Sequence, residues 1–352
     1  MALQLTAGIL AAALYFHSGA SPAAAPAAAP FKIVTASERG TYFVIGKDLA
    51  KLVAPDAGIE LEVVPTSGSA TNVKLLRYEP GVKLAIVQAD VYQAFVDRGR
   101  GANSEARRMI QPLRVILPLY NTEIHYIVRA DSKLNYLHEI KDERINGGLV
   151  GSGAAFITHT LYRMMFKGPI PEANASYLSN EEALVKLISD KSIDVVVVAA
   201  GQPAPLIANM KPEAQKYIKL LKFDPAHPSS KVPLETYVPY TVRASSYPNL
   251  LTQNFTTIAV GAYLVTYDYQ TKHTIDDLVR FGRSLCQNFS RLQANGHPKW
   301  REVNLGLHEL SPGWIYHTPS TGEIRACVAQ AKAPATPSRA CSPEEKILGL
   351  CN

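Results

Sequence analysis

The chain has 352 residues, of which 47% are hydrophobic and 19% charged, a composition typical of globular proteins that excludes a disordered chain. This length allows two domains of ordinary size, each with its own core. The net charge of +6 favours anionic small ligands or acidic surfaces, although it is equally compatible with a role in solubility alone. Because the basic residues form no block of roughly five or more, nucleic acid is not an expected partner.

The N-terminus carries an export pattern. Residues 5–16 are apolar and uncharged, and they are too few to span a bilayer as a helix. Small residues follow at 18–25 and an Ala-Pro repeat at 21–30, so residues 1–30 are predicted to be a secretory signal peptide and linker. The first four residues lack Lys and Arg, which departs from the usual pattern. A buried N-terminal helix is disfavoured because the prolines would interrupt it. The mature protein is therefore expected in the periplasm.

The first strand-like and helix-like segments alternate after this linker. Short apolar runs at residues 31–36, 61–65 and 83–89 predict three strands, and apolar residues at helical spacing follow each of them. This repetition predicts a mainly parallel sheet that is covered by helices, the arrangement of an α/β domain.

A second set of elements begins at residues 124–128, which are predicted to form a strand that leaves the first domain. Further strands are predicted at residues 148–151, 176–178 and 193–200. The last of these is continuously apolar, as expected of a strand that is buried on both faces. The chain then returns through residues 238–247 to a strand at 257–266 and a helix.

This order of elements predicts a domain that is interrupted by an inserted second domain. The first domain is expected to comprise residues 31–123 and 241–325, and the second residues 124–240. Residues 326–352 are expected to form a Cys-containing tail.

All four cysteines lie in the last quarter of the chain. In an exported protein an even number favours disulfides, for which three pairings are possible. A Ser-Pro-Glu-Glu sequence after Cys341 predicts a helix over residues 343–350. Such a helix would hold Cys341 and Cys351 about 15 Å apart, beyond the roughly 7 Å that a disulfide allows. Cys286 and Cys327 are thus expected to bond to the tail cysteines or to each other, with free thiols as the alternative if export fails.

Two short turns of small and hydroxyl-bearing residues, at 66–69 and 151–154, each lie between a predicted strand and a predicted helix. Glycine lets a backbone approach a ligand closely, and free N–H groups at a helix N-terminus bind anions. One such turn alone is more simply a capped helix start, but five polar turns at corresponding strand ends favour a binding site. The candidate ligand-binding residues are Thr41, Tyr42, Ser67, Gly68, Ser69, Asn72, Gln88, Asp90, Ser152, Gly153, Ala154, Ala155, Gly201 and Gln202.

The polar groups at these strand ends allow more than one ligand chemistry. Hydroxyls and backbone donors suit a carboxylate, whereas Asn72, Gln88, Asp90 and Gln202 are able to bind an ammonium or amide group. Asp90 has an equal alternative as the charge at the start of the next helix, and Tyr42 as a packing residue.

Enzyme motifs are missing from the sequence. It contains no Gly-x-Ser-x-Gly nucleophile elbow, no His-Glu-x-x-His and no phosphate-binding Gly-x-x-x-x-Gly-Lys-Ser/Thr loop. The nine histidines are scattered, and the cysteines lack metal-site spacing. We therefore expect a protein that is not an enzyme, with no cofactor and no metal, although catalytic triads are spatial and need no sequence motif.

The order of the polar motifs resembles the TAXI family, the TRAP-associated extracytoplasmic immunogenic proteins, over roughly residues 31–320. The motifs that carry this resemblance are Thr-Ala at 35–36, Gly-Thr-Tyr-Phe at 40–43, Thr-Ser-Gly-Ser-Ala-Thr-Asn at 66–72, Gln-Ala-Asp at 88–90, Gly-Ser-Gly-Ala at 151–154, Ile-Asp-Val at 193–195 and Gly-Gln-Pro at 201–203.

The resemblance implies a solute receptor of a TRAP transporter with a two-lobed, class II periplasmic-binding-protein fold and hinge strands between its lobes. Such a receptor closes on a small anionic solute, a glutamate-like amino acid or organic acid, and delivers it to TRAP membrane subunits. Two departures stand out: Ser-Glu-Arg at 37–39 replaces a region that is commonly Gly-containing, and Ala154 replaces the usual Thr, so the second turn lacks one hydroxyl donor.

The leading hypothesis is therefore an exported, monomeric receptor that binds its solute between two lobes. The alternative is a periplasmic ligand sensor or scaffold that signals through a membrane partner without transport. An extracytoplasmic enzyme on the same architecture is a third hypothesis.

Overall fold

The computed structural model describes residues 30–98, 104–332 and 347–348. The predicted signal peptide, nearly all of the linker and most of the helix expected over 343–350 lie outside these residues. In the described part of the chain, none of the helices has the length and apolarity needed to cross a bilayer.

One mixed sheet of ten strands runs through the described residues. The strands are β1 (Phe31–Val34), β2 (Leu61–Val64), β3 (Val82–Gln88), β4 (Leu113–Arg129), β5 (Ile145–Asn146), β6 (Ala175–Ser176), β7 (Val195–Ala199), β8 (Ile218–Leu220), β9 (Val238–Val242) and β10 (Phe255–Tyr267). Their order is β2-β1-β3-β10-β4-β7-β5-β6, with β8 beside β4 and β9 beside β10.

Helices cover this sheet. They are α1 (Thr41–Leu52), α2 (Ser69–Tyr78), α3 (Val91–Arg98), α4 (Glu105–Ile110), α5 (Gly153–Phe166), α6 (Asn180–Ile188), α7 (Pro205–Ala208), α8 (Lys272–Gln287), α9 (Phe289–Asn295) and α10 (Thr318–Lys332), and short 3₁₀ turns include η8 (Pro298–Glu302). Helix α1 shows why these segments are helical: its buried Ile45 and Leu49 recur four residues apart and face the core, as in an amphipathic helix.

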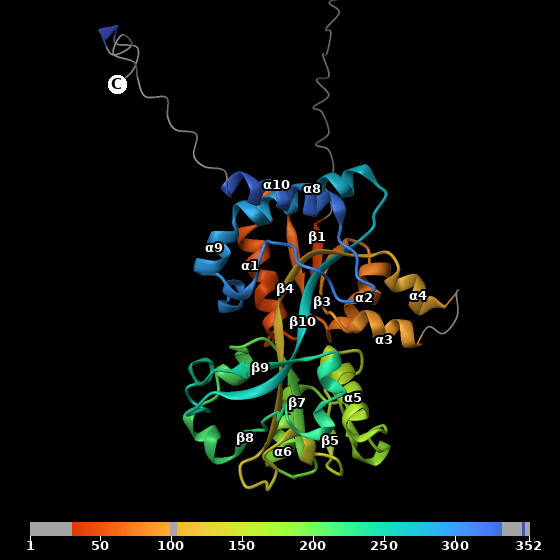
Figure 1. Ribbon diagram of the computed structural model, residues 1–352, viewed down its shortest axis with the longest axis vertical. Helices are drawn as coiled ribbons and strands as arrows, with labels where there is room; N and C mark the ends of the chain where they lie inside the picture. Colours follow the sequence, from red (N-terminus) through yellow and green to blue (C-terminus); the bar gives the residue numbers. More distant parts are fainter. Residues whose placement is uncertain (1–29, 99–103, 333–346, 349–352) are drawn as a thin grey trace, which may run out of the picture.

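Figure 1 shows two halves joined by long strands. The first lobe contains β1 to β3, α1 to α4 and α8 to α10, and the second contains β5 to β8, α5 and α6. Strands β4 and β10 run through both lobes as an antiparallel pair, and β9 lies beside β10. The predicted two-lobed α/β fold with hinge strands is confirmed.

The direction of the strands differs between the lobes and the hinge. In the first lobe β1 is parallel to β2 and β3, and in the second lobe β5 is parallel to β6 and β7. The long strands β4 and β10 are antiparallel to their neighbours β7 and β3. The parallel sheets expected for each lobe are therefore joined into one sheet by an antiparallel centre.

Two predicted strands differ from the observed ones. The strand predicted at residues 148–151 is absent, because Gly148 and Gly151 have φ of 89° and 85°, a left-handed conformation that an extended strand does not allow. The strand predicted at 124–128 is the second part of β4. Because β4 passes through both lobes, it does not begin at the boundary proposed between residues 123 and 124.

The C-terminal part of the described chain packs onto the first lobe. A disulfide joins Cys286 in α8 to Cys327 in α10, with the two Cα atoms 6.3 Å apart, and this is one of the pairings that the sequence left open. Because α10 extends to Lys332, the tail predicted to begin at residue 326 starts inside this helix.

Candidate functional site

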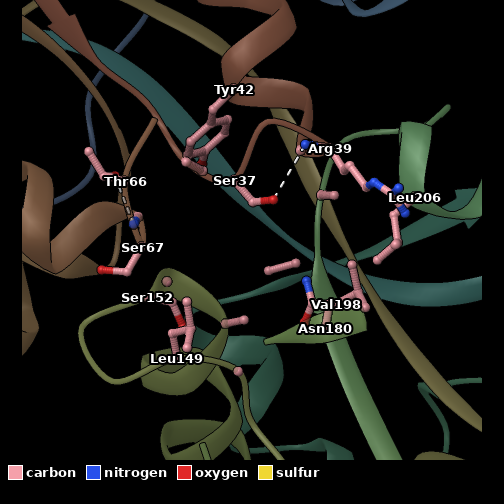
Figure 2. Close-up of a pocket in the computed structure, with 18 of the residues that line it drawn as sticks. Ser37, Arg39, Tyr42, Thr66, Ser67, Leu149, Ser152, Asn180, Val198 and Leu206 are labelled. Carbon is pink, nitrogen blue, oxygen red and sulfur yellow. Dashed lines mark hydrogen bonds between the residues drawn. The ribbon is translucent and has the colours of Figure 1, made fainter. Parts of the chain in front are cut away.

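A cavity of about 120 Å³ lies between the two lobes. Its walls include the residues at the carboxyl ends of β1, β2, β3 and β7, the position at which open α/β sheets bind ligands. Figure 2 shows Tyr42 and Ser67 approaching it from the first lobe, and Leu149, Ser152 and Asn180 from the second.

Four helices point their N-termini into this cavity. Helices α1, α2, α5 and α6 begin at Thr41, Ser69, Gly153 and Asn180, and each of these residues lines it. The first N–H groups of a helix have no partner within the helix, and the helix dipole places a partial positive charge there. Two of these helices come from each lobe, so the cavity is electrostatically suited to an anion.

The turn before α2 shows why glycine is needed at this site. Gly68 has φ of 124°, and a Cβ atom built on it would lie 3.2 Å from the backbone N of Gly153 in the other lobe. The Gly68 N–H donates to Thr66 Oγ1 at 3.0 Å, and the hydroxyls of Ser67 and Thr71 lie 2.5 Å apart. The hydroxyl groups of Thr66 and Ser67 therefore already have partners in this turn and in α2.

The two predicted turns are in direct contact. The Thr71 N–H donates to the Gly151 carbonyl at 3.2 Å, and Gly68 packs against the backbone of Ser152 and Gly153. Ser152 caps α5 by accepting a hydrogen bond from the Ala155 N–H at 2.9 Å. The turns thus close one wall of the cavity together instead of facing each other across it.

Gln88 lies at this wall. Its backbone N–H donates to Ser69 Oγ at 3.1 Å, and its side chain extends toward the second lobe, where a Cβ on Gly153 would lie 2.2 Å from Gln88 Oε1. Gln88 is 2% exposed, and among the described residues its Oε1 has no hydrogen-bond partner.

Asn72 does not line the cavity, although the sequence placed it among the ligand-binding candidates. Its side-chain amide donates to the carbonyls of Thr35 and Ile86 at 2.5 and 2.8 Å, and its oxygen accepts from Thr66 at 2.6 Å. Asn72 thus joins α2 to the ends of β1 and β3. Ala155, another candidate, is buried in α5 and lies outside the lining as well.

Asp90 also lies outside the cavity lining. Its Oδ2 accepts a hydrogen bond from the Tyr237 hydroxyl at 2.9 Å, and its Oδ1 has no partner among the described residues. Burial raises the pKa of Asp90 to about 7, while the Tyr237 hydrogen bond acts in the opposite direction. Asp90 directly precedes α3, the position that the alternative interpretation as a helix-start charge gave it. Its side chain also bonds to the segment that enters β9.

The turn after β7 belongs to the hinge. The Gln202 amide donates to Glu123 Oε1 at 2.8 Å and to the Thr241 carbonyl at 2.7 Å, and its oxygen accepts from the Arg243 N–H at 2.7 Å. Glu123 also forms a fully buried ion pair with Lys299 at 2.6 Å. Gln202 therefore connects β4 and β9 and has no remaining group for a ligand.

Gly201 and the start of α1 connect the lobes. The Thr41 hydroxyl donates to the Gly201 carbonyl at 2.5 Å, and a Cβ on Gly201 would lie 2.7 Å from the Tyr120 ring. Tyr42, the next residue, lines the cavity, and its hydroxyl lies 3.3 Å from Thr122 Oγ1. Burial raises the pKa of Tyr42 above its usual value, so its phenol stays protonated.

Several lining residues were not predicted from the sequence. Leu149, Val198 and Leu206 form apolar parts of the wall. At the rim, Arg39 and Glu181 form an ion pair at 3.8 Å. A signal for the start of α6 was present, because Ser179 is followed three residues later by a Glu, the pattern of a capping box after a predicted strand.

A larger cavity of about 520 Å³ lies at the hinge, between β4, β9, β10 and residues 308–311. Its lining includes the carboxylates of Glu302 and Glu309 and no α-helix N-terminus among the described residues. Glu302 already accepts hydrogen bonds from Tyr240 and Lys299 at 2.8 and 2.6 Å. We take the smaller, interlobe cavity as the candidate site because helix N-termini of both lobes converge on it. Elsewhere in the described chain, no group of three or more His, Cys, Asp or Glu is placed to hold a metal ion.

The chain belongs to the NMT1-like family, whose model matches residues 33–310. This match does not identify the chain as a member of the TAXI family, which is the more specific assignment.

Solved structures with a similar fold include three binding proteins. The substrate-binding protein of an amino acid ABC transporter is 14% identical, with 76% of this chain and 98% of that chain covered and a TM-score of 0.42. The ligand-binding component of an ABC-type import system from Staphylococcus aureus is 14% identical, with coverages of 86% and 91% and a TM-score of 0.43. The periplasmic binding protein BugD is 15% identical, with coverages of 86% and 94% and a TM-score of 0.46. At such low identity none of their ligands carries over to this chain.

Proposed function

We propose that this protein is an extracytoplasmic solute receptor that binds a small organic anion between its lobes and closes around it. The convergence of the N-termini of α1, α2, α5 and α6 on one cavity carries this proposal. Each terminus supplies N–H donors and partial positive charge, and two come from each lobe, so an anion strengthens the contact between the lobes.

The charges around the cavity support an anion over a cation. Glu181 is the acidic residue of the lining, and Arg39 is paired with it at the rim. Asp90, the other candidate carboxylate, is held by Tyr237 outside the cavity. A carboxylate group placed at the helix N-termini therefore meets donors and no unpaired negative charge.

The apolar side chains of the wall indicate where the remainder of the solute lies. Leu149, Val198 and Leu206 offer contacts to carbon atoms. The volume of about 120 Å³ is below the roughly 300 to 1,000 Å³ of pockets for drug-sized ligands, so the solute must be small. The lining contains no His or Cys, in keeping with binding without covalent chemistry.

The proposal includes periplasmic location, a monomeric receptor and TRAP membrane subunits as the partner. The export pattern of residues 1–30 and the order of the polar motifs that resembles the TAXI family support it.

Ala154 provides a direct test, because it lines the cavity in the first turn of α5. Ala154→Asp introduces a negative charge that stabilises a helix N-terminus but repels an anion in the cavity. Ala154→Asn has nearly the same shape without the charge and is the matched control.

The experiment is isothermal titration of ligand-stripped protein with mono- and dicarboxylates. We expect at least one to bind the wild type, Ala154→Asn to bind it within a few-fold, and Ala154→Asp to lose at least about tenfold in affinity. Binding of no carboxylate, or equal affinity in the Asp variant, would refute the proposal.

A further inference from the structure

Asp90 is a buried carboxyl group at the contact between the lobes. It lies between β3 and α3, on the side of the first lobe that faces α5 of the second (Figure 1). Asp90 is 8% exposed, and its Oδ2 accepts a hydrogen bond from the neutral Tyr237 hydroxyl at 2.9 Å. Its Oδ1 has no partner among the described residues. One neutral donor does not replace the hydration of an ionised carboxylate, so this position favours the protonated form.

The residue that donates to Asp90 belongs to the second lobe. The backbone N–H of Tyr237 donates to the Pro233 carbonyl at 2.9 Å, in the 3₁₀ turn η6 (Pro233–Glu235). This turn packs against α5, and α5 also lies against α3, the helix that Asp90 precedes. The hydrogen bond between Asp90 and Tyr237 therefore crosses from one lobe to the other. Separation of the lobes would part the two residues and admit water to the carboxyl group.

The other ionisable groups around this contact are tyrosines. Tyr42 of α1 lies near Asp90, and Tyr126 of β4 lies near Tyr237. Burial raises the pKa of all three tyrosines above the usual value, so they stay neutral between pH 5 and pH 8. No Lys, Arg or His in the described part of the chain stabilises the Asp90 carboxylate, and burial raises the pKa of Asp90 to about 7. Asp90 is thus the group at this contact whose charge changes near neutral pH.

We propose that closure of the lobes takes up one proton at Asp90, so that the receptor binds its solute more tightly in acidic than in neutral medium. The proton comes from the solvent and stays on the carboxyl group while the lobes are in contact. Because the closed state binds this proton more strongly than the open state, affinity for the solute rises as the pH falls. This inference rests on the proposed function and adds a regulation of the same site.

Isothermal titration of the ligand-stripped full chain at pH 6 and pH 8 tests this. The probes are lactate, pyruvate, glutamate and 2-oxoglutarate, whose carboxyl groups are ionised at both pH values. With a pKa of about 7, the closed state has about ten protonated Asp90 groups for each ionised one at pH 6, and about the reverse at pH 8. We therefore expect about tenfold tighter binding at pH 6. Equal affinity at the two pH values overturns the inference.

The variant Asp90→Asn assigns the effect to this residue. Because Asn does not ionise, the difference in affinity between the two pH values should fall below about threefold. Burial also raises the pKa of Glu123 and lowers that of His297 near the hinge, and their contributions remain in this variant. Asp276→Asn, on the surface of α8, is the matched control and should keep the wild-type difference. The full wild-type difference in Asp90→Asn overturns the inference.

The number of protons is measured by repeating the titration at pH 6 in buffers of different ionisation enthalpy. The dependence of the binding enthalpy on the buffer should correspond to about one proton taken up per solute by the wild type, and to almost none by Asp90→Asn. A carboxylate that binds to the wild type without proton uptake refutes this inference alone. Binding of no carboxylate refutes the proposed function as well.

Tyr237→Phe supplies a second test if Asp90→Asn does not fold. The Tyr237 hydrogen bond lowers the pKa of Asp90, so its loss should raise that pKa. In a series of titrations over pH, the fall in affinity should then occur at higher pH than in the wild type. An unchanged midpoint overturns the inference.

Discussion

At the residue scale, the site depends on positions where side chains are missing. Gly153 leaves the space that the Gln88 side chain occupies, and Gly68 allows the backbone of Ser152 and Gly153 to approach. These contacts join the lobes at the cavity wall. The glycines of the two turns therefore matter mainly because they allow the lobes to come into contact, and less because of the turns that contain them.

Gly153→Ala should separate solute binding from folding. The added methyl group would lie 2.2 Å from Gln88 Oε1 and 2.6 Å from its Cδ, so the side chain or the lobes must move apart. We expect the affinity for the solute to fall at least about tenfold. The melting temperature without solute should fall by at most a few degrees, because the atoms that must move belong to the end of one flexible side chain.

The matched control is Gly168→Ala, where a Cβ meets no atom within 4 Å. It should leave the affinity for the solute unchanged. Equal affinities in the two variants would mean that the contact between Gln88 and Gly153 does not matter for binding.

At the scale of elements, the helix N-termini that build the cavity differ in role from the helices that pack on each other away from it. The starts of α2 and α5 build the cavity, while α8 and α10 pack far from it on the outer side of the first lobe. Gly282 of α8 lies so close to α10 that a Cβ would be 2.7 Å from the Ser320 carbonyl oxygen. The disulfide between Cys286 and Cys327 fastens the same two helices.

Loss of this disulfide should lower stability without changing the site. The bridge closes a loop with a sequence separation of 41 residues, which in the chain-entropy model corresponds to about 4 kcal/mol. We expect the Cys286→Ser, Cys327→Ser double variant to show a lower free energy of unfolding in urea, by up to that amount, and wild-type affinity for the solute.

Dithiothreitol provides the control for this pair. It should destabilise the wild type and have little further effect on the double variant. A double variant as stable as the oxidised wild type would show that the bridge does not hold α8 against α10.

At the scale of the whole molecule, several long-range contacts hold the lobes together. Thr41 donates to Gly201, and the Thr71 N–H donates to Gly151. The Tyr237 hydroxyl, ahead of β9, donates to Asp90 at the end of β3. Because Asp90 is a buried carboxyl with a pKa raised to about 7, its contact makes the stability of the assembled lobes depend on pH.

The sign of this dependence follows from the direction of the shift. Between its ordinary pKa of 3.8 and about 7, Asp90 keeps a proton in the folded protein that the unfolded chain has released. Stability therefore falls as the pH rises through this range, and the loss is complete above the folded-state pKa. Asp90→Asn, which cannot ionise, should reduce the difference in unfolding free energy between pH 5 and pH 8 by roughly 2 kcal/mol.

Urea unfolding followed by circular dichroism at both pH values measures this difference. Asp276→Asn, in which the replaced carboxylate is exposed on α8, is the control and should behave as the wild type. The same pH difference in Asp90→Asn and wild type would contradict the role of Asp90.

The sequence by itself determined the alternation of strands and helices, the polar turns at the strand ends and the two-lobed class. These features depend on local patterns: apolar spacing, helix caps and glycine in turns. Ser67, Gly68, Ser152 and Gly153 were therefore correctly placed at helix starts, and they do line the interlobe cavity.

Only the tertiary structure decided which polar side chains face the cavity and which hold the fold. Asn72 and Gln202 carry the same amide group as Gln88, but both of their amide groups are bonded to residues of distant strands, such as Ile86 and Thr241. No local pattern encodes those partners, because they are set by how distant segments pack. The same reason explains why β4 continues through the predicted domain boundary, and why the turns before α2 and α5 touch.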